Sequence, residues 1–373
     1  MRYANFICKL VAKTAKDLHM SKKKCNFAAL NKKKEMSERL RRKAGHDYSK
    51  PAAYMITVTT TNREPLLGTL AYDKPEDAHV EPTPLGLAVI AEFYEIEKQI
   101  FAKTGCAIQI IQYQLMPDHF HGVLYIKEEL PKSWSLGKII GAWKGACSRA
   151  YWRNTSSTRS IRSESLFEPG FHDRILHGKG QMQRWITYLH DNPRRLAIKR
   201  EKPDLFRIHQ QTSIRGVYCT TLGNIFLTEH PQRAVLQCSR SLTDEQIEAQ
   251  KRQCLQDAVN GTVFITAAIS PGEEKITRAL REKGFPLIIL LEKGFPAPDS
   301  EQYKYFKPQG VYFEACAAGK LLLVEPAQEL FEREDIVSQV EAKVGHIPHE
   351  TLRYRFVALN AIAEKMSKGD ERG

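Results

Sequence analysis

The chain has 373 residues and a formal net charge of +13, with 42% hydrophobic and 27% charged residues. This length is typical of two domains, and the apolar content is sufficient for two cores. No apolar run is long enough for a transmembrane helix, no apolar segment of a secretory signal follows the N-terminal lysines, and the eight cysteines form no Cys-x-x-Cys pair. We therefore expect a cytoplasmic protein without membrane contact, disulfide framework or zinc ribbon.

The basic excess is confined to the first part of the chain. Residues 1–206 contain 35 lysines and arginines against 21 acidic residues, whereas residues 207–373 contain 21 and 22. Residues 1–50 are the most basic, and we interpret them as a basic N-terminal arm with a helix near Glu35–Ala44. Nucleic acid would bind such a region and gain affinity from counterion release, although a solubilising surface is the simpler alternative.

Residues 51–206 predict an α+β domain. The expected elements are a strand, a helix, two strands joined by Met116-Pro117-Asp118, a helix, a basic loop and a last helix stopped by Pro193. Their expected bounds are Tyr54–Thr60, Pro84–Lys103, Ile108–Leu115, His119–Ile126, Leu136–Trp152, Arg153–Ser165 and Gln181–Asn192. Two helices interleaved with an antiparallel sheet predict a sandwich of the ferredoxin-like kind.

Residues 207–373 predict an accessory α/β domain, with the boundary near Arg207–Arg215. Strands are expected at Ala234–Cys238, Thr262–Ala267, Pro286–Leu291 and Leu321–Glu325, alternating with helices at Thr243–Val259, Glu273–Lys283 and Val311–Ala318. An amphipathic helix at Glu350–Met366 closes the chain. Alternation of this kind predicts a doubly wound, Rossmann-like fold with a parallel sheet.

The motif with the clearest chemistry is His119-Phe120-His121. Because side chains alternate across a strand, the two histidines share one face and Phe120 turns to the other. Two imidazoles about 7 Å apart at their Cα atoms can converge on one divalent cation. Taken alone, the pattern is weak evidence, because most such pairs are incidental exposed strand histidines.

The helix at Gln181–Asn192 adds Tyr188 and Asn192, which lie four residues apart on one helical face. A tyrosine on a helix commonly packs, and Asn-Pro commonly ends a helix. Beside two histidines, however, they offer a phenolic nucleophile and an amide oxygen suited to a third metal ligand. A tyrosine can attack a phosphodiester and hold the 5′-phosphate covalently while a metal ion neutralises developing charge.

Four motifs in this order resemble those of the His-hydrophobe-His ("HUH") single-tyrosine transposases, specifically the REP-associated tyrosine transposases. The matching segments are Met116-Pro117-Asp118-His119-Phe120-His121, Leu136–Lys144, Phe171-His172-Asp173-Arg174 and Tyr188-Leu189-His190-Asp191-Asn192-Pro193. The resemblance implies a ferredoxin-like nuclease, Mg²⁺ or Mn²⁺ at His119 and His121, Asn192 as a further ligand and Tyr188 as the nucleophile. It also implies cleavage and rejoining of single-stranded DNA folded into REP-like hairpins, by a monomer or a homodimer, at the bacterial nucleoid.

Basic side chains near these motifs are the expected DNA contacts. By residue type they are Lys138, Lys144, Arg149, His172, Arg174, Arg194 and Arg195. For His172 and Arg174, ordering of the site or a purely structural role is an equal alternative. The sequence departs from the family in two ways. The relatives are commonly near the size of this first domain alone, and their tyrosine motif continues Asn-Pro-Val-Arg-Ala-Gly, where this chain has Asn192-Pro193-Arg194-Arg195-Leu196-Ala197.

In the second domain, Ser270 and Gly272 follow a strand and open a helix, so their backbone N–H groups form a candidate anion site, with ordinary capping as the alternative. The stretch Ile269–Glu325 resembles the Rossmann-like fold of the DNA-processing protein A family. The matching segments are Ser270-Pro271-Gly272-Glu273, Gly294-Phe295, Lys307-Pro308-Gln309-Gly310 and Ala315-Cys316-Ala317-Ala318-Gly319. No complete Gly-x-Gly-x-x-Gly supports a dinucleotide cofactor.

The sequence thus favours an active tyrosine transposase and leaves two alternatives. One is a catalytically silent protein that binds hairpin DNA, and the other is a nucleotide-responsive regulator that acts through the C-terminal domain. Retention of Tyr188, both histidines and Asn192 favours the enzyme, because binding alone requires none of them.

Overall fold

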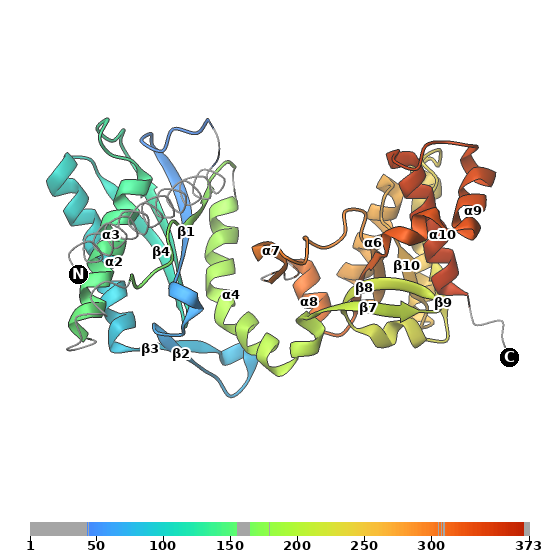
Figure 1. The fold of residues 1–373 in the computed structure, drawn as a ribbon, viewed down its shortest axis with the longest axis horizontal. Helices are drawn as coiled ribbons and strands as arrows, with labels where there is room; N and C mark the ends of the chain where they lie inside the picture. The colour runs from blue at the N-terminus through green and yellow to red at the C-terminus, as the bar shows by residue number, and fades with distance from the viewer. Residues whose placement is uncertain are drawn as a thin grey trace, which may run out of the picture. The chain divides into compact units, whose positions relative to one another are not determined.

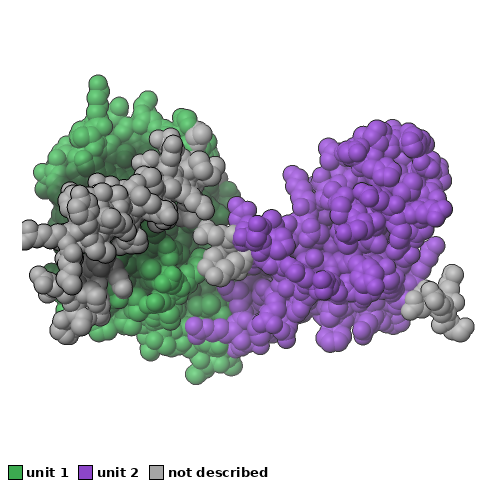
Figure 2. Space-filling view, in the orientation of Figure 1, with its two compact units in different colours: residues 1–197 green, residues 198–373 purple. Residues whose placement is uncertain are grey.

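The chain forms two compact units, residues Met1–Ala197 and Ile198–Gly373, which are described separately (Figures 1 and 2). The second unit thus begins before Arg207–Arg215, where the sequence placed the boundary. The expected basic arm and basic loop fall almost entirely outside the described residues. The computed structural model describes residues 43, 45–154, 165–178, 180–304, 306, 308 and 310–368.

The first unit is built on a four-stranded antiparallel sheet with the order β4-β5-β1-β6. Its strands and helices follow one another as strand, helix, strand, strand, helix, strand, which confirms the predicted α+β class. They are β1 (Ala52–Thr59), α2 (Pro84–Thr104), β4 (Ile108–Met116), β5 (His119–Ile126), α3 (Leu136–Asn154) and β6 (His172–Ile175). A small hairpin, β2 (Gly68–Ala71) and β3 (His79–Pro82), and two short 3₁₀ turns, η1 (Thr61–Arg63) and η2 (Pro75–Asp77), lie between β1 and α2.

The main core of this unit lies between one face of the sheet and helices α2 and α3. Phe120 of β5 is fully buried there, with its ring centroid 4.8 Å from that of Phe93 on α2 and 5.1 Å from that of Trp143 on α3. Helix α2 starts after Thr83, whose hydroxyl accepts a hydrogen bond from the Gly86 amide. These contacts determine which strand residues face the helices and which face the opposite side.

The opposite face of the sheet is covered by α4 (Gln181–Glu201). Trp185 and Leu189 are buried against Met55 of β1 and Val123 of β5. This contact places the helix with the predicted nucleophile on the sheet face opposite the main core.

The prediction that Pro193 ends this helix was wrong, because α4 continues to Glu201. Proline lacks an N–H donor and costs about 3 kcal/mol in a helix interior. The helical turn that follows buries Ala197, and Asp191 forms ion pairs with Arg194 and Arg195 beyond the proline. These contacts offset the lost hydrogen bond. The expectation that proline ends a helix considers the proline alone and does not include them.

The second unit contains a six-stranded mixed sheet with the order β7-β8-β12-β11-β10-β9. Strands β9 to β12 are parallel, and β8 pairs antiparallel with β12 and with β7. The bounds are β7 (Ile208–Ile214), β8 (Val217–Gly223), β9 (Arg233–Val235), β10 (Val263–Thr266), β11 (Leu287–Leu290) and β12 (Leu321–Pro326). The four predicted parallel strands are all present, so the α/β class is confirmed.

Helices cover both faces of this sheet. Helices α5, α6 and α8 contribute to one hydrophobic cluster, and α9 and α10 contribute to another. The helices are α5 (Asp244–Val259), α6 (Pro271–Glu282), α7 (Glu301–Lys304), α8 (Val311–Ala317), α9 (Glu334–Val344) and α10 (Leu352–Ser367), with 3₁₀ turns η4 (Pro203–Phe206), η5 (Ile225–Glu229) and η6 (Gln328–Glu332). Among the described residues, no helix is long and apolar enough to cross a membrane.

The hairpin of β7 and β8 and the helix α9 were not predicted. The hairpin turns at Arg215 and Gly216, whose φ angles are 50° and 71°. A two-residue turn with positive φ at both positions normally carries Asn-Gly or Asp-Gly, and an arginine at its first position hides the signal.

We expect Gly122→Ala to lower the free energy of unfolding of the first unit by about 1–3 kcal/mol. A Cβ at Gly122 would lie 2.5 Å from Cζ of Phe93, whose ring is held between Phe120 and Trp143. Gly141→Ala is the matched control, because a Cβ there meets no atom within 4 Å and alanine favours the helix. Urea unfolding followed by tryptophan fluorescence measures both; equal stability of the two variants would contradict this packing.

Candidate nuclease site

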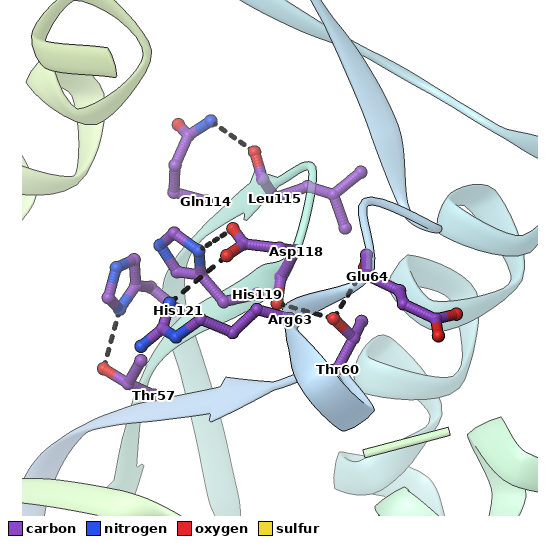
Figure 3. Close-up of polar contacts among 9 residues, drawn as sticks. All are labelled: Thr57, Thr60, Arg63, Glu64, Gln114, Leu115, Asp118, His119 and His121. Carbon is purple, nitrogen blue, oxygen red and sulfur yellow. Dashed lines mark hydrogen bonds and ion pairs between the residues drawn. The ribbon is translucent and has the colours of Figure 1, made fainter. Parts of the chain in front are cut away.

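His119 and His121 lie on the face of β5 opposite the main core, as the strand alternation predicted (Figure 3). Their ring centroids are 4.8 Å apart, and the rings are nearly perpendicular. His121 is buried and His119 is about one-fifth exposed. Two imidazoles at this spacing present their nitrogens to one small volume.

His119 is oriented by its neighbour in the turn before β5. Its Nδ1 lies 2.6 Å from Oδ1 of Asp118, and Nη1 of Arg63 lies 3.2 Å from the other carboxylate oxygen (Figure 3). Burial alone would raise the pKa of Asp118, but the hydrogen bonds and positive charges of His119 and Arg63 together lower it to about 2. The carboxylate is therefore ionised at neutral pH and holds the His119 ring in place.

His121 is oriented by a residue on the neighbouring strand. Thr57 of β1 is its partner in the strand register, and Oγ1 of Thr57 lies 2.8 Å from Nδ1 of His121 (Figure 3). In both histidines Nδ1 therefore contacts a protein oxygen. This is the usual arrangement in which Nε2 of the same ring binds a metal ion.

Tyr188 approaches these histidines from α4. Its ring centroid lies 6.0 Å from that of His121, and the guanidinium carbon of Arg195 lies 5.8 Å from the Tyr188 ring. Arg195 is one helical turn away from Asp191 and forms an ion pair with it at 2.5 Å. The structure thus brings together a phenol, two imidazoles and a guanidinium, three of which were predicted as catalytic or metal-binding residues.

Asn192 follows Tyr188 by one helical turn and is buried, with 6% of its surface exposed. Its Nδ2 has no hydrogen-bond partner among the described residues. A buried amide that is not fully satisfied by protein is typical of a site completed by water, an ion or a ligand. The unpartnered group is an N–H donor, so it calls for an acceptor such as water, whereas a metal ion would bind the amide oxygen Oδ1.

His119 and His121 alone do not complete a metal site. In the described part of the chain, no group of three or more histidines, cysteines and carboxylates is arranged to hold a metal ion. An amide oxygen is an acceptable ligand for Mg²⁺ and Mn²⁺, which prefer oxygen donors. The residues present therefore fit such an ion if Asn192 contributes.

The predicted DNA contacts on β6 lie on the histidine face of the sheet. His172 is opposite Thr57 in the register and Arg174 is opposite Met55, so both share the face of His121. Both side chains are exposed. Basic residues of β6 and α4 thus border the face that carries the two histidines.

The predicted DNA contacts on α3 lie elsewhere, because α3 packs against the opposite face of the sheet. Lys138 and Arg149 are distant from the histidine face for this reason. Lys144 donates to the backbone oxygens of Glu168 and Gly170, at 2.5 and 2.7 Å, and so anchors the segment that leads into β6. The helix carries basic residues, but the structure does not bring them to the nuclease site.

The candidate anion site at Ser270 and Gly272 is filled by the chain itself. The carboxylate of Glu273 accepts hydrogen bonds from the amides of Ile269 and Cys238, at 2.8 and 3.1 Å. Ser270 caps the same helix, with its Oγ accepting from the Glu273 amide. An external anion would have to displace a carboxylate that is 2% exposed.

Thr57, Arg63 and the role of Asp118 were missed from the sequence. Asp118 directly precedes His119, so its proximity was visible, but it was interpreted only as a turn residue. Thr57 and His121 are 64 residues apart and meet only through the pairing of β1 with β5. Their contact requires a strand register that a single sequence does not provide.

Comparison with known proteins identifies one region of the chain. No curated protein matches the chain. Two solved structures are similar to part of the chain. One is described as a REP-associated tyrosine transposase bound to a REP hairpin; it is 12% identical, the match covers 41% of this chain and 72% of that chain, and the TM-score is 0.26. The other is a transposase-like protein from Deinococcus radiodurans R1; it is 17% identical, the match covers 41% of this chain and 98% of that chain, and the TM-score is 0.23. Residues 86–192 match the family described as "Transposase IS200 like", so the chain contains an IS200-like transposase domain.

Proposed function

We propose that the first unit is a metal-dependent endonuclease of single-stranded DNA that cleaves and rejoins hairpin-bearing strands through a phosphotyrosine at Tyr188. The observation that supports this most is the meeting of Tyr188 with His119 and His121 on one sheet face, from α4 and β5. The order of strands and helices is that of ferredoxin-like domains, as the resemblance implied. The transposase domain found over residues 86–192 includes all four proposed site residues.

The reaction needs a nucleophile and a leaving group in line. Oη of Tyr188 forms a bond to the phosphorus as the bond to the 3′-oxygen breaks, the phenolic proton is lost, and the 3′-oxygen gains a proton. The DNA is left with a 5′-phosphate on Tyr188 and a free 3′-hydroxyl. Attack by a 3′-hydroxyl reverses these steps, so rejoining needs no ATP.

Nε2 of His119, Nε2 of His121 and the amide oxygen of Asn192 would hold Mg²⁺ or Mn²⁺. When bound, such an ion polarises the phosphoryl oxygens and neutralises charge in the transition state. Asp118 and Thr57 orient the two rings through Nδ1. Arg195 supplies positive charge beside Tyr188, where the scissile phosphate would lie.

From the motif resemblance we infer that the partner is single-stranded DNA with REP-like hairpins. We expect this binding to take place in the bacterial cytoplasm. Arg174 and His172 lie exposed on the histidine face and would contact the DNA backbone. Arg194 and Arg195 would contact the DNA backbone from α4, which packs over the same face of the sheet.

Tyr188→Phe should abolish a covalent protein–DNA product. Wild-type protein is incubated with labelled single strands that carry hairpins from its own genomic neighbourhood, with Mg²⁺ or Mn²⁺, and a slowed band is sought on denaturing gels. Tyr94→Phe is the matched control, because Tyr94 is exposed on α2, across the sheet. Tight hairpin binding with no covalent band from wild-type protein would instead support the catalytically silent DNA-binding protein.

Thr57→Val should reduce the rate of adduct formation by about 10- to 100-fold or raise the Mn²⁺ concentration required by a similar factor. Valine keeps the shape of threonine but removes the oxygen 2.8 Å from Nδ1 of His121. Thr57→Ser retains the hydroxyl and should retain most of the activity. A valine variant with the wild-type rate at every Mn²⁺ concentration would show that this contact is not needed.

Arg174→Gln should weaken hairpin binding and reduce the slope of log affinity against log salt by about 0.7–0.9, the loss of one phosphate contact. Arg149→Gln removes the same charge from an exposed position on α3 and should leave the slope unchanged. Fluorescence anisotropy at several salt concentrations gives both slopes. Equal losses in the two variants would mean that DNA extends over α3, as the sequence suggested.

A further inference from the structure

The second unit contains a crevice that the nuclease site does not use, where two neighbouring parallel strands diverge. After β11 the chain passes to the face of α5, α6 and α8, where Phe295 and Tyr303 pack. After β12 it passes to the other face, where Leu330 and Phe331 pack with α9 and α10. Connections that leave adjacent strands on opposite faces open a crevice at their carboxyl ends, which is the usual ligand position in open α/β sheets.

A cavity of about 810 Å³ lies at this place, and we call it the strand-end crevice. Its volume is within the range of small-molecule sites. Its walls come from the segment after β11, the end of β12 with η6, the β7–β8 hairpin and α10. Among its lining residues are Gln210, Tyr218, Phe295, Tyr303, Glu325 and Arg355.

Two charged groups of opposite sign are held in this crevice. Arg355 is fixed by two contacts. Its Nε donates a hydrogen bond to the backbone oxygen of Glu292 at 3.0 Å, and its guanidinium carbon lies over the Phe331 ring, 4.9 Å from the ring centroid. In the described part of the chain, no hydrogen bond or ion pair engages its terminal nitrogens. Glu325 accepts a hydrogen bond from the Phe295 amide at 3.1 Å. Its carboxylate packs against Gly294, where a Cβ would lie only 2.0 Å from Oε1 of Glu325.

The remaining walls are aromatic and amide groups. Tyr218 is 63% exposed at the crevice. Gln210 donates to the hydroxyl of Tyr303 at 2.8 Å, and Gln211 beside it has a φ of 54° in a bulge of β7. Bulges redirect side chains and are frequent beside functional sites, and a non-glycine residue with positive φ is strained. The bulge thus places two amides in the crevice at a cost to the strand.

We propose that the strand-end crevice binds a nucleotide. A base has a flat face for Tyr218 and amino or ring N–H groups for the carboxylate of Glu325, and its phosphate matches the fixed guanidinium of Arg355. An α-amino acid also carries both charges, but it would fill little of this volume and would not use the amides. The nucleotide is either free or part of a DNA strand, and the proposal does not depend on cleavage by Tyr188.

The test is isothermal titration calorimetry of the full chain with nucleoside monophosphates and with trinucleotides, which are too short to form a hairpin. Tyr218→Ser and Arg355→Gln should each raise the dissociation constant at least tenfold. The matched controls are Phe226→Ser, since Phe226 is 71% exposed in the same unit, and Arg353→Gln, which changes an exposed arginine of α10 outside the crevice. Both controls should bind as the wild type does. Tyr218→Ser removes an exposed ring, so it keeps the test valid if Arg355→Gln unfolds.

If the wild type binds monophosphates and the two crevice variants do not, the ligand is a free nucleotide. If the wild type binds only trinucleotides and the two crevice variants lose this binding, the ligand is a nucleotide within a strand. The proposal is overturned if neither binds, or if binding is the same in the crevice variants and the controls. It is also overturned if free phenylalanine or tyrosine binds with this dependence on Tyr218 and Arg355 and nucleotides do not.

Discussion

The burial of Phe120 is the interaction on which the candidate nuclease site depends. Its ring packs against Phe93 and Trp143, so β5 cannot shift along its neighbours without exposing a large aromatic side chain. Because a slip of one residue would turn every side chain to the other face, this apolar contact holds His119 and His121 on the side of α4. The placement of the two histidines is thus set by a hydrophobic core on the opposite face of the sheet, and their polar contacts orient the rings.

The second half of the site depends on α4 in a similar way. Leu189 is fully buried against the sheet, and Tyr188, its neighbour in the chain, is carried to within 6.0 Å of His121. The arginines beyond Pro193 contribute only because the helix continues. Had the helix stopped at the proline, Arg195 would not lie one turn from Asp191 or face the Tyr188 ring. The departure from the family motif at Arg194 and Arg195 therefore adds positive charge beside Tyr188 without loss of the helix.

Local patterns predicted most of the fold, because they record properties of single elements. The alternation in β5 gave its bounds, His119–Ile126, and the shared face of its histidines. Properties that depend on contacts between distant segments were not predictable. Thr57 meets His121 through strand pairing, and Lys144 of α3 proved to anchor the segment before β6. The sequence left the helix start at Ser270 open between an anion site and ordinary capping, and it does not show that the Glu273 carboxylate also reaches the Cys238 amide.

Because Glu273 fills the start of α6, an external ligand of the second unit would bind elsewhere. A sheet of this kind offers external ligands two main positions, the helix N-termini and the crevice where its connections diverge. Glu273 occupies the start of α6, and the crevice beside β12 is a position of the second kind. Residues 207–373 carry 21 basic and 22 acidic residues, so long-range attraction contributes little there. Selection in the crevice would therefore depend on Tyr218, Glu325 and Arg355 at short range. It would vary less with salt than the DNA binding that we propose for the basic first unit.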